Sequence, residues 1–71
     1  MSDLDARLLA AHEAGDTPAL VQLYREAADA AADTDAACFY LTHAYVFALE
    51  TGHPDTAMLK ARLVAEGREP G

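Results

Sequence analysis

Two short breaks of the same design divide the chain into helix-forming segments. Residues 15–18 read Gly-Asp-Thr-Pro, and residues 52–55 read Gly-His-Pro-Asp. Glycine suits the left-handed position that follows a helix end, and proline suits the first turn of a helix, where its missing N–H costs nothing. Apolar residues at helical spacing lie on both sides of each break. The pattern therefore predicts that the chain folds back twice, into two helical hairpins.

The chain is expected to form an all-α fold, because no segment alternates between apolar and polar residues as a strand would. The expected helices run roughly over 3–14, 18–32, 36–50 and 54–66. We expect four antiparallel helices arranged as two stacked hairpins, about 3–32 and about 36–66, within a single helical domain, 1–71. Residues 67–71 are expected to be a flexible tail.

The link at 33–35 reads Asp-Thr-Asp and contains neither glycine nor proline. Its side chains compete for backbone hydrogen bonds, which favours a turn. Alanines on both sides leave one bent helix through the link as an alternative. The segment after it is apolar on nearly all sides, which is typical of a central helix that packs on more than one face. Its four aromatic residues cannot all point inward, so at least one should reach a neighbouring hairpin, a second copy or a partner.

Composition narrows the class of partner. Twelve acidic residues against five basic ones give a net charge of -7, which disfavours nucleic acid and anionic membranes. The single cysteine excludes an internal disulfide and a multi-cysteine zinc site. A 71-residue chain also builds only a small core, so association is the available source of further stability. The acidic N-terminus and the short apolar run at 36–49 predict a cytoplasmic protein that does not contact membranes.

The charged side chains have simple local interpretations. Arg25 and Asp29 lie four residues apart and can pair along one helix. Lys60, Arg62 and Arg68 gather near the end of the last helix, where positive charge complements the helix dipole.

Candidate catalytic and metal-binding residues do not combine into a recognisable site. His12, His43 and His53 lack partners at the helical spacings that bring two ligands to one metal, so no metal and no cofactor is expected. Cys38 and His43 lie five residues apart on one helix, and their side chains are expected to diverge. No nucleophile–base pair is predicted, and no residue is assigned a catalytic role.

The spacing of small and aromatic residues resembles the tetratricopeptide repeat, a helical hairpin of about 34 residues. The residues that carry the resemblance are Leu8, Ala11, Gly15, Leu20, Tyr24 and Ala27 in the first unit, and Leu41, Tyr45, Gly52, Ala57, Ala61 and Val64 in the second. The chain departs from the family in lacking tryptophan, in placing Thr42 at a small-residue position, and in a third helix nearly one turn longer. A plain three-helix or four-helix bundle is the alternative.

The resemblance implies a right-handed stack that binds a peptide or a partner helix along the first helix of each pair. It places the binding residues at Asp5, Leu9, His12, Phe39, His43 and Phe47. Some members of the family bind a C-terminal carboxylate through lysine, arginine and asparagine. The matching positions carry Asp5, Leu9, Phe39 and His43, so that mode of binding is not implied.

Two functional hypotheses follow. The first is a non-catalytic protein–protein interaction module that binds a protein segment, or self-associates as a homodimer, through its first and third helices. The second is a small helical enzyme or ligand-binding bundle with a pocket around His43, Tyr40 and Cys38. The first is favoured because two hairpins are too few for an independent repeat array, which usually needs three or more units.

Overall fold

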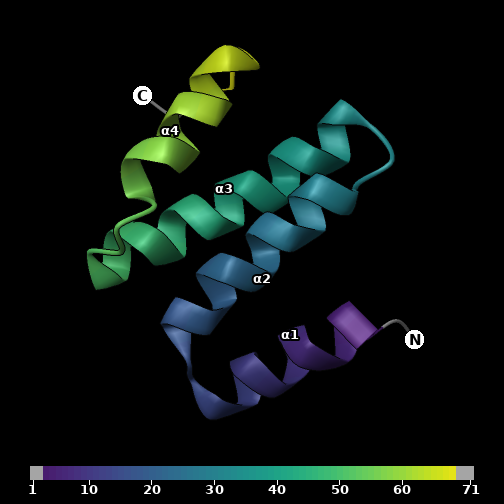
Figure 1. Ribbon diagram of the computed structural model, residues 1–71, viewed down its shortest axis with the longest axis vertical. Helices are drawn as coiled ribbons and strands as arrows, with labels where there is room; N and C mark the ends of the chain where they lie inside the picture. The colour runs from purple at the N-terminus through teal and green to yellow at the C-terminus, as the bar shows by residue number, and fades with distance from the viewer. Residues whose placement is uncertain (1–2, 69–71) are drawn as a thin grey trace.

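The computed structural model describes residues 3–68, and this part of the chain forms four α-helices and no strand. The helices are α1 (Asp3–Ala14), α2 (Thr17–Ala30), α3 (Thr34–Thr51) and α4 (Thr56–Ala65). α2 and α3 lie side by side through the centre, with α1 beside α2 and α4 beside α3 (Figure 1). The Cα atoms extend 31 × 28 × 15 Å, so the molecule is thin in one direction. The predicted all-α fold of stacked hairpins is confirmed.

Both predicted breaks are present, and each reverses the chain direction. Gly15 and Gly52 adopt the left-handed conformation, with φ of 65° and 63°. The N–H of Asp16 donates to the carbonyl of Ala11 at 3.0 Å, and the N–H of His53 donates to that of Ala48 at 2.9 Å. These bonds satisfy carbonyls at the helix ends that have no partner inside the helix. A local capping motif therefore ends each first helix, as the sequence predicted.

The link between α2 and α3 is a true break, which excludes one bent helix. The backbone is extended at Ala31, with ψ of 143°. Asp33 then caps α3, because its carboxylate accepts a hydrogen bond from the Ala36 N–H at 2.8 Å. The cap shifts both boundaries: α2 ends at Ala30 instead of residue 32, and α3 begins at Thr34 instead of residue 36.

The second break is longer than expected. Pro54 was expected to open the last helix, but α4 begins at Thr56. A tight turn precedes it, in which the N–H and the hydroxyl of Thr56 both donate to the His53 carbonyl, at 3.1 and 2.7 Å. Asp55 occupies the N-cap position without a capping bond from its side chain. The carboxylate pairs with Arg25 of α2 instead.

The core lies mainly between α2 and α3, which share the most extensive packing in the fold. Ala28, Ala44 and Ala48 are buried there, and their small side chains allow the two backbones to approach closely. A second cluster forms between α1 and α2, around Ala11, Leu20 and Leu23. Tyr24 and Phe47 pack against both clusters and so join them into one core.

The buried face of α4 differs from the expected one. From the sequence, α4 was expected to make its contacts through Ala57, Met58, Ala61, Leu63 and Val64; Leu63 is buried, but the other four are exposed. The fully buried residues are Leu59 and Leu63, one turn apart. α4 packs on α3 alone and therefore needs only a narrow apolar stripe. In contrast, α2 packs on two helices and buries a broader face, which includes Val21 and Ala28.

Ion pairs connect helices that are distant in sequence. Arg25 pairs with Asp55 at 3.0 Å, and Arg62 pairs with Asp29 at 2.8 Å. The expected pair between Arg25 and Asp29 within α2 is therefore wrong, because each side chain reaches across to the second hairpin. The Arg25–Asp55 pair is partly buried, whereas Arg62–Asp29 is exposed, and exposed ion pairs typically stabilise a fold by about 1 kcal/mol or less. These side-chain contacts link α2 to α4 and to the turn before it, although the backbone of α4 packs on α3.

The end of the described chain is held in place. The N–H groups of Gly67 and Arg68 donate to the carbonyls of Val64 and Leu63, at 2.9 and 2.8 Å, and so close the C-terminus of α4. Of the tail predicted over 67–71, these two residues are thus hydrogen-bonded, and residues 69–71 lie outside the described residues. Within 3–68, none of the helices combines the length and the apolar character that a membrane crossing requires.

Candidate functional site

One face of α3 exposes a line of apolar side chains. We define the α3 stripe as Phe39, Thr42, Val46 and Leu49, which follow one another at spacings of three, four and three residues. Phe39 is 59%, Val46 46% and Leu49 55% exposed, and Thr42 is exposed as well. The opposite face of the helix buries alanines against α2, so the exposed face has no covering helix within the described residues. The stripe spans about 15 Å along the helix axis.

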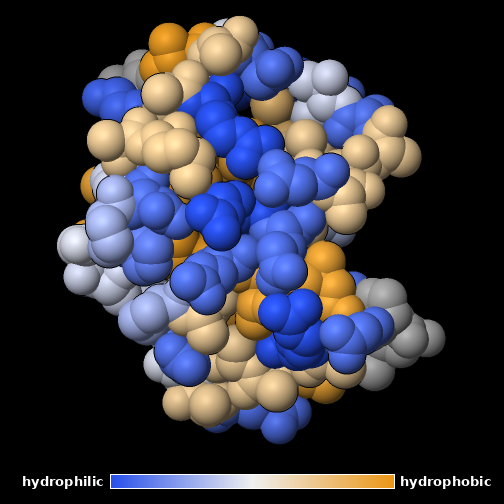
Figure 2. Space-filling model, viewed as in Figure 1, coloured by the Kyte–Doolittle hydropathy of each residue, from blue (hydrophilic) through white to orange (hydrophobic). Residues whose placement is uncertain are grey.

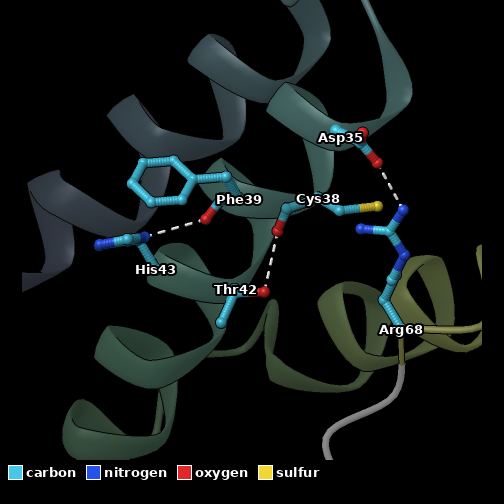
Figure 3. A pocket seen from close by; sticks show the side chains of 6 residues that line it. All are labelled: Asp35, Cys38, Phe39, Thr42, His43 and Arg68. Atoms are coloured by element: carbon cyan, nitrogen blue, oxygen red, sulfur yellow. Dashed lines mark hydrogen bonds and ion pairs between the residues drawn. The ribbon is translucent and has the colours of Figure 1, made fainter.

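Two adjoining hollows lie along this face. The larger, about 610 Å³, is open to solvent, and Figure 3 shows the side chains that line it: Asp35, Cys38, Phe39, Thr42, His43 and Arg68. The smaller, about 230 Å³, is almost wholly apolar and is lined by Thr42, His43, Val46 and Phe47. Thr42 and His43 belong to both, so the hollows form one continuous surface along α3. On the face shown in Figure 2, hydrophilic areas separate the hydrophobic patches.

The polar side chains of this face bond back to their own helix. The Thr42 hydroxyl donates to the Cys38 carbonyl at 2.8 Å. The Nδ1 atom of His43 lies 2.9 Å from the Phe39 carbonyl. A carbonyl oxygen can only accept, so Nδ1 carries the proton in this contact, and Nε2 of the neutral ring is left as an acceptor. Both side chains are thereby oriented before any partner arrives.

A cluster of aromatic rings supports the face from behind. Its centre is Tyr24 of α2, whose ring stacks on His43 at 5.1 Å and on Phe47 at 5.8 Å between centroids. Tyr24 also approaches Tyr40 at 6.2 Å, and its hydroxyl lies 2.9 Å from Nε2 of His12 on α1. We call these five rings together with Phe39, which contacts Tyr40 and His43, the ring cluster. It joins α1, α2 and α3 side by side.

The structure brings together four of the six predicted binding residues. His12, Phe39, His43 and Phe47 all belong to the ring cluster. From the sequence, Tyr24 was named among the residues that carry the tetratricopeptide resemblance, and its central place in the ring cluster was missed. A signal was available, because a tyrosine on an inward face needs a partner for its hydroxyl. The line of exposed residues at 39, 42, 46 and 49 was also missed, because α3 is apolar on nearly every side.

The other two predicted binding residues lie apart from the ring cluster. Asp5 and Leu9 are exposed on α1, at helical spacing from His12. Leu9 is 52% exposed, whereas the neighbouring Leu4 and Leu8 pack into the core between α1 and α2. The backbones of α1 and α3 do not pack directly on each other; only side chains such as His12 and Phe47 meet. The two hollows described above follow α3 and are lined by no residue of α1.

The alternative pocket around His43, Tyr40 and Cys38 is only partly assembled. Cys38 and His43 both line the larger hollow, but Tyr40 does not, since its ring packs against Tyr24 and Phe39. Cys38 is 2% exposed, and its sulfur points toward the guanidinium of Arg68 (Figure 3). His43 directs Nδ1 to its own helix, and the two residues share no hydrogen bond. Within residues 3–68 they do not form a nucleophile–base pair.

Arg68 closes one end of the larger hollow. Its guanidinium pairs with the Asp35 carboxylate at 2.6 Å, and this hydrogen bond raises the pKa of the Arg68 side chain. Arg62 is likewise held by Asp29, so two of the three basic residues near the C-terminus are neutralised by acids of the first hairpin and of the start of α3. The expected positive charge at the end of α4 is therefore largely compensated.

The third histidine belongs to a turn. The N–H of Asp55 donates to Nδ1 of His53 at 3.0 Å, which leaves the proton of the neutral ring on Nε2. Nowhere in the described part of the chain do three histidine, cysteine or acidic side chains converge in a way that could hold a metal ion. Comparison with known proteins gives no further guide, because no protein family, curated protein or solved structure matches the chain.

Proposed function

We propose that this chain is a non-catalytic protein-interaction module whose binding surface is the α3 stripe with its two hollows. One observation carries the proposal. The central helix keeps Phe39, Val46 and Leu49 about half exposed, in a single line, although the chain is short of buried apolar surface. A contiguous apolar surface on a small protein commonly marks an interaction site.

The spacing of the stripe indicates how a partner would bind. Apolar residues at alternating intervals of three and four form the seam along which a second helix packs its side chains. The hollows on either side of Thr42 provide room for side chains from that helix. The ring cluster holds His43 and Phe47 against Tyr24, so part of the surface is ordered before binding and loses little conformational entropy on association.

The enzyme or ligand-bundle hypothesis has less support. Tyr40 is turned away from the larger hollow, and the hollow is open and shallow rather than enclosed. Ligand sites for small molecules are usually concave cavities that bury most of the ligand. A location in the cytoplasm stays a prediction from the sequence, as does the resemblance to tetratricopeptide repeats.

Site-specific photo-crosslinking tests the proposal. A photoreactive amino acid replaces Val46 in the stripe or, as a matched control, Val64 on α4; the two valines are 46% and 51% exposed. In cells of the source organism, we expect position 46 to give a discrete protein adduct and position 64 to give none. The absence of an adduct at position 46, or equal adducts at both positions, would contradict the proposal.

A further inference from the structure

Along the α3 stripe, Thr42 and His43 present hydrogen-bond acceptors, and Arg68, the cation in the lining of the larger hollow, is already paired with Asp35. These features indicate the chemistry of a complementary partner. We propose that the α3 stripe binds a cationic amphipathic helix of another protein, with apolar side chains on one face and lysines or arginines beside them. The inference rests on the proposed function and adds the class of partner. It is carried by the hydrogen bonds of Thr42 and His43 and by the charge of the chain.

Two polar side chains of the α3 stripe and its hollows, Thr42 and the neutral ring of His43, have each used their only proton within α3. The Thr42 hydroxyl donates to Cys38, and His43 donates through Nδ1 to Phe39, which leaves lone pairs directed outward. A partner that covers the face must therefore bring donors, because a buried acceptor without a donor is costly.

The charges of the chain also favour a cationic partner. Glu50 follows Leu49 at the end of the stripe; its side chain is exposed and makes no ion pair within the described residues. Every arginine of the chain is paired with an acid of its own molecule, as shown by Arg7 with Glu26 and by the three pairs described above. The chain as a whole carries a net charge of -7. Lysine and arginine side chains, which only donate, complement such a face.

A second copy of the chain fits this face less well. Two α3 stripes in contact would place acceptors opposite acceptors and would bring together two molecules that each carry a net charge of -7. The stripe is also only about 15 Å long, and a stable homodimer interface usually buries more area than one short helix face provides. A separate cationic helix avoids both difficulties and needs only three or four turns to cover the stripe.

A pair of synthetic peptides tests the inference on the full chain. The probe is a helical peptide of about 18 residues with leucines on one face and lysines on the other, and its companion has glutamates in place of the lysines. Peptide binding is followed by fluorescence anisotropy and by the amide NMR shifts of the chain. We expect the lysine peptide to bind at least about tenfold more tightly than the glutamate peptide, to shift amides of α3, and to weaken as salt is added.

Matched variants locate the site. Val46→Ser should weaken binding of the lysine peptide by about three- to tenfold, because a half-exposed valine loses its apolar contact. Val64→Ser, at a similarly exposed position on α4, should leave affinity within about twofold. Glu50→Gln should weaken binding more than Glu66→Gln, which makes the same change in charge beyond the end of α4. Far-UV circular dichroism checks that each variant keeps its helices, as expected for changes at exposed positions.

Several results would overturn the inference. They are failure of the lysine peptide to bind, equal binding of the glutamate peptide, or equal effects of the two valine changes. If sedimentation shows a mass that rises with concentration from 7.5 kDa to twice that value, and Val46→Ser abolishes the rise, the occupant is a second copy. That result would support the proposed interaction module and refute the proposed cationic partner. If the lysine peptide does not bind and position 46 also yields no crosslinked adduct, both the proposed interaction module and the proposed cationic partner are wrong.

Discussion

Tyr24 should be the side chain on which the fold depends most, because it lies where α1, α2 and α3 meet. Its ring is half-buried, packs against both core clusters, and contacts the rings of His12, Tyr40, His43 and Phe47. Truncation of a core aromatic to alanine costs about 3–5 kcal/mol, and partial burial places Tyr24→Ala near the lower value. A domain of this size has only about 3–5 kcal/mol in total, so the variant should retain at most about 2 kcal/mol.

Two companion variants separate the contributions of the ring and the hydroxyl. Tyr24→Phe keeps every ring contact and loses only the 2.9 Å contact to His12, so it should cost about 0.5–1 kcal/mol. Phe39→Ala removes a ring that is 59% exposed and contacts only Tyr40 and His43, and it should cost about 1 kcal/mol.

Urea unfolding followed by far-UV circular dichroism measures all three changes. With a slope near 1 kcal/mol per molar urea for a small chain, Tyr24→Phe and Phe39→Ala should each lower the midpoint by about 0.5–1 M, and Tyr24→Ala should lower it by about 3 M. Equal losses for Tyr24→Ala and Phe39→Ala would refute the central position of Tyr24. A Tyr24→Phe loss as large as that of Tyr24→Ala would show that the hydroxyl, not the ring, joins the helices.

Three further predictions follow from local geometry. Arg68→Ala should uncover Cys38 and speed its alkylation by a thiol reagent in the folded protein; an unchanged rate would show that Arg68 does not shield the sulfur. Gly52→Ala should destabilise the fold by about 1 kcal/mol in thermal unfolding, because φ is 63° there with free space around the added methyl; an unchanged melting temperature would contradict this. ¹⁵N NMR at alkaline pH should find His43 protonated on Nδ1 and His53 on Nε2; the same tautomer for both rings would refute the assigned hydrogen bonds.

The features that could be predicted from sequence are those with local causes. The chain reversals at Gly15 and Gly52 depend on capping within a few residues, so both hairpins were predictable. The helix boundaries around Asp33 and Pro54 shifted by two residues because caps and turns compete over that distance. The choice of partner for Arg25 was not predictable, because Asp55 is 30 residues away in sequence and is brought close only by the packing of the two hairpins.

The candidate site was predictable only in part, for a related reason. Aromatic residues on α3 indicated a functional face, and His43 and Phe47 lie there. An apolar pattern on all sides of a helix does not show which side its neighbours leave uncovered. That side became visible only when α2 and α4 were in place, and with it the exposed line from Phe39 to Leu49. The same holds for α4, where burial of Leu59 instead of Met58 depends on how the helix meets α3.

The central claim is that a partner protein covers the exposed side of α3, and crosslinking from residue 46 compared with residue 64 tests it most directly. These positions carry the same amino acid with nearly the same exposure, so the comparison isolates their place on the molecule. The account predicts a discrete adduct from position 46 alone, lost when an excess of the lysine peptide competes for the surface. Adducts of equal yield from both positions, or none from position 46, would contradict it.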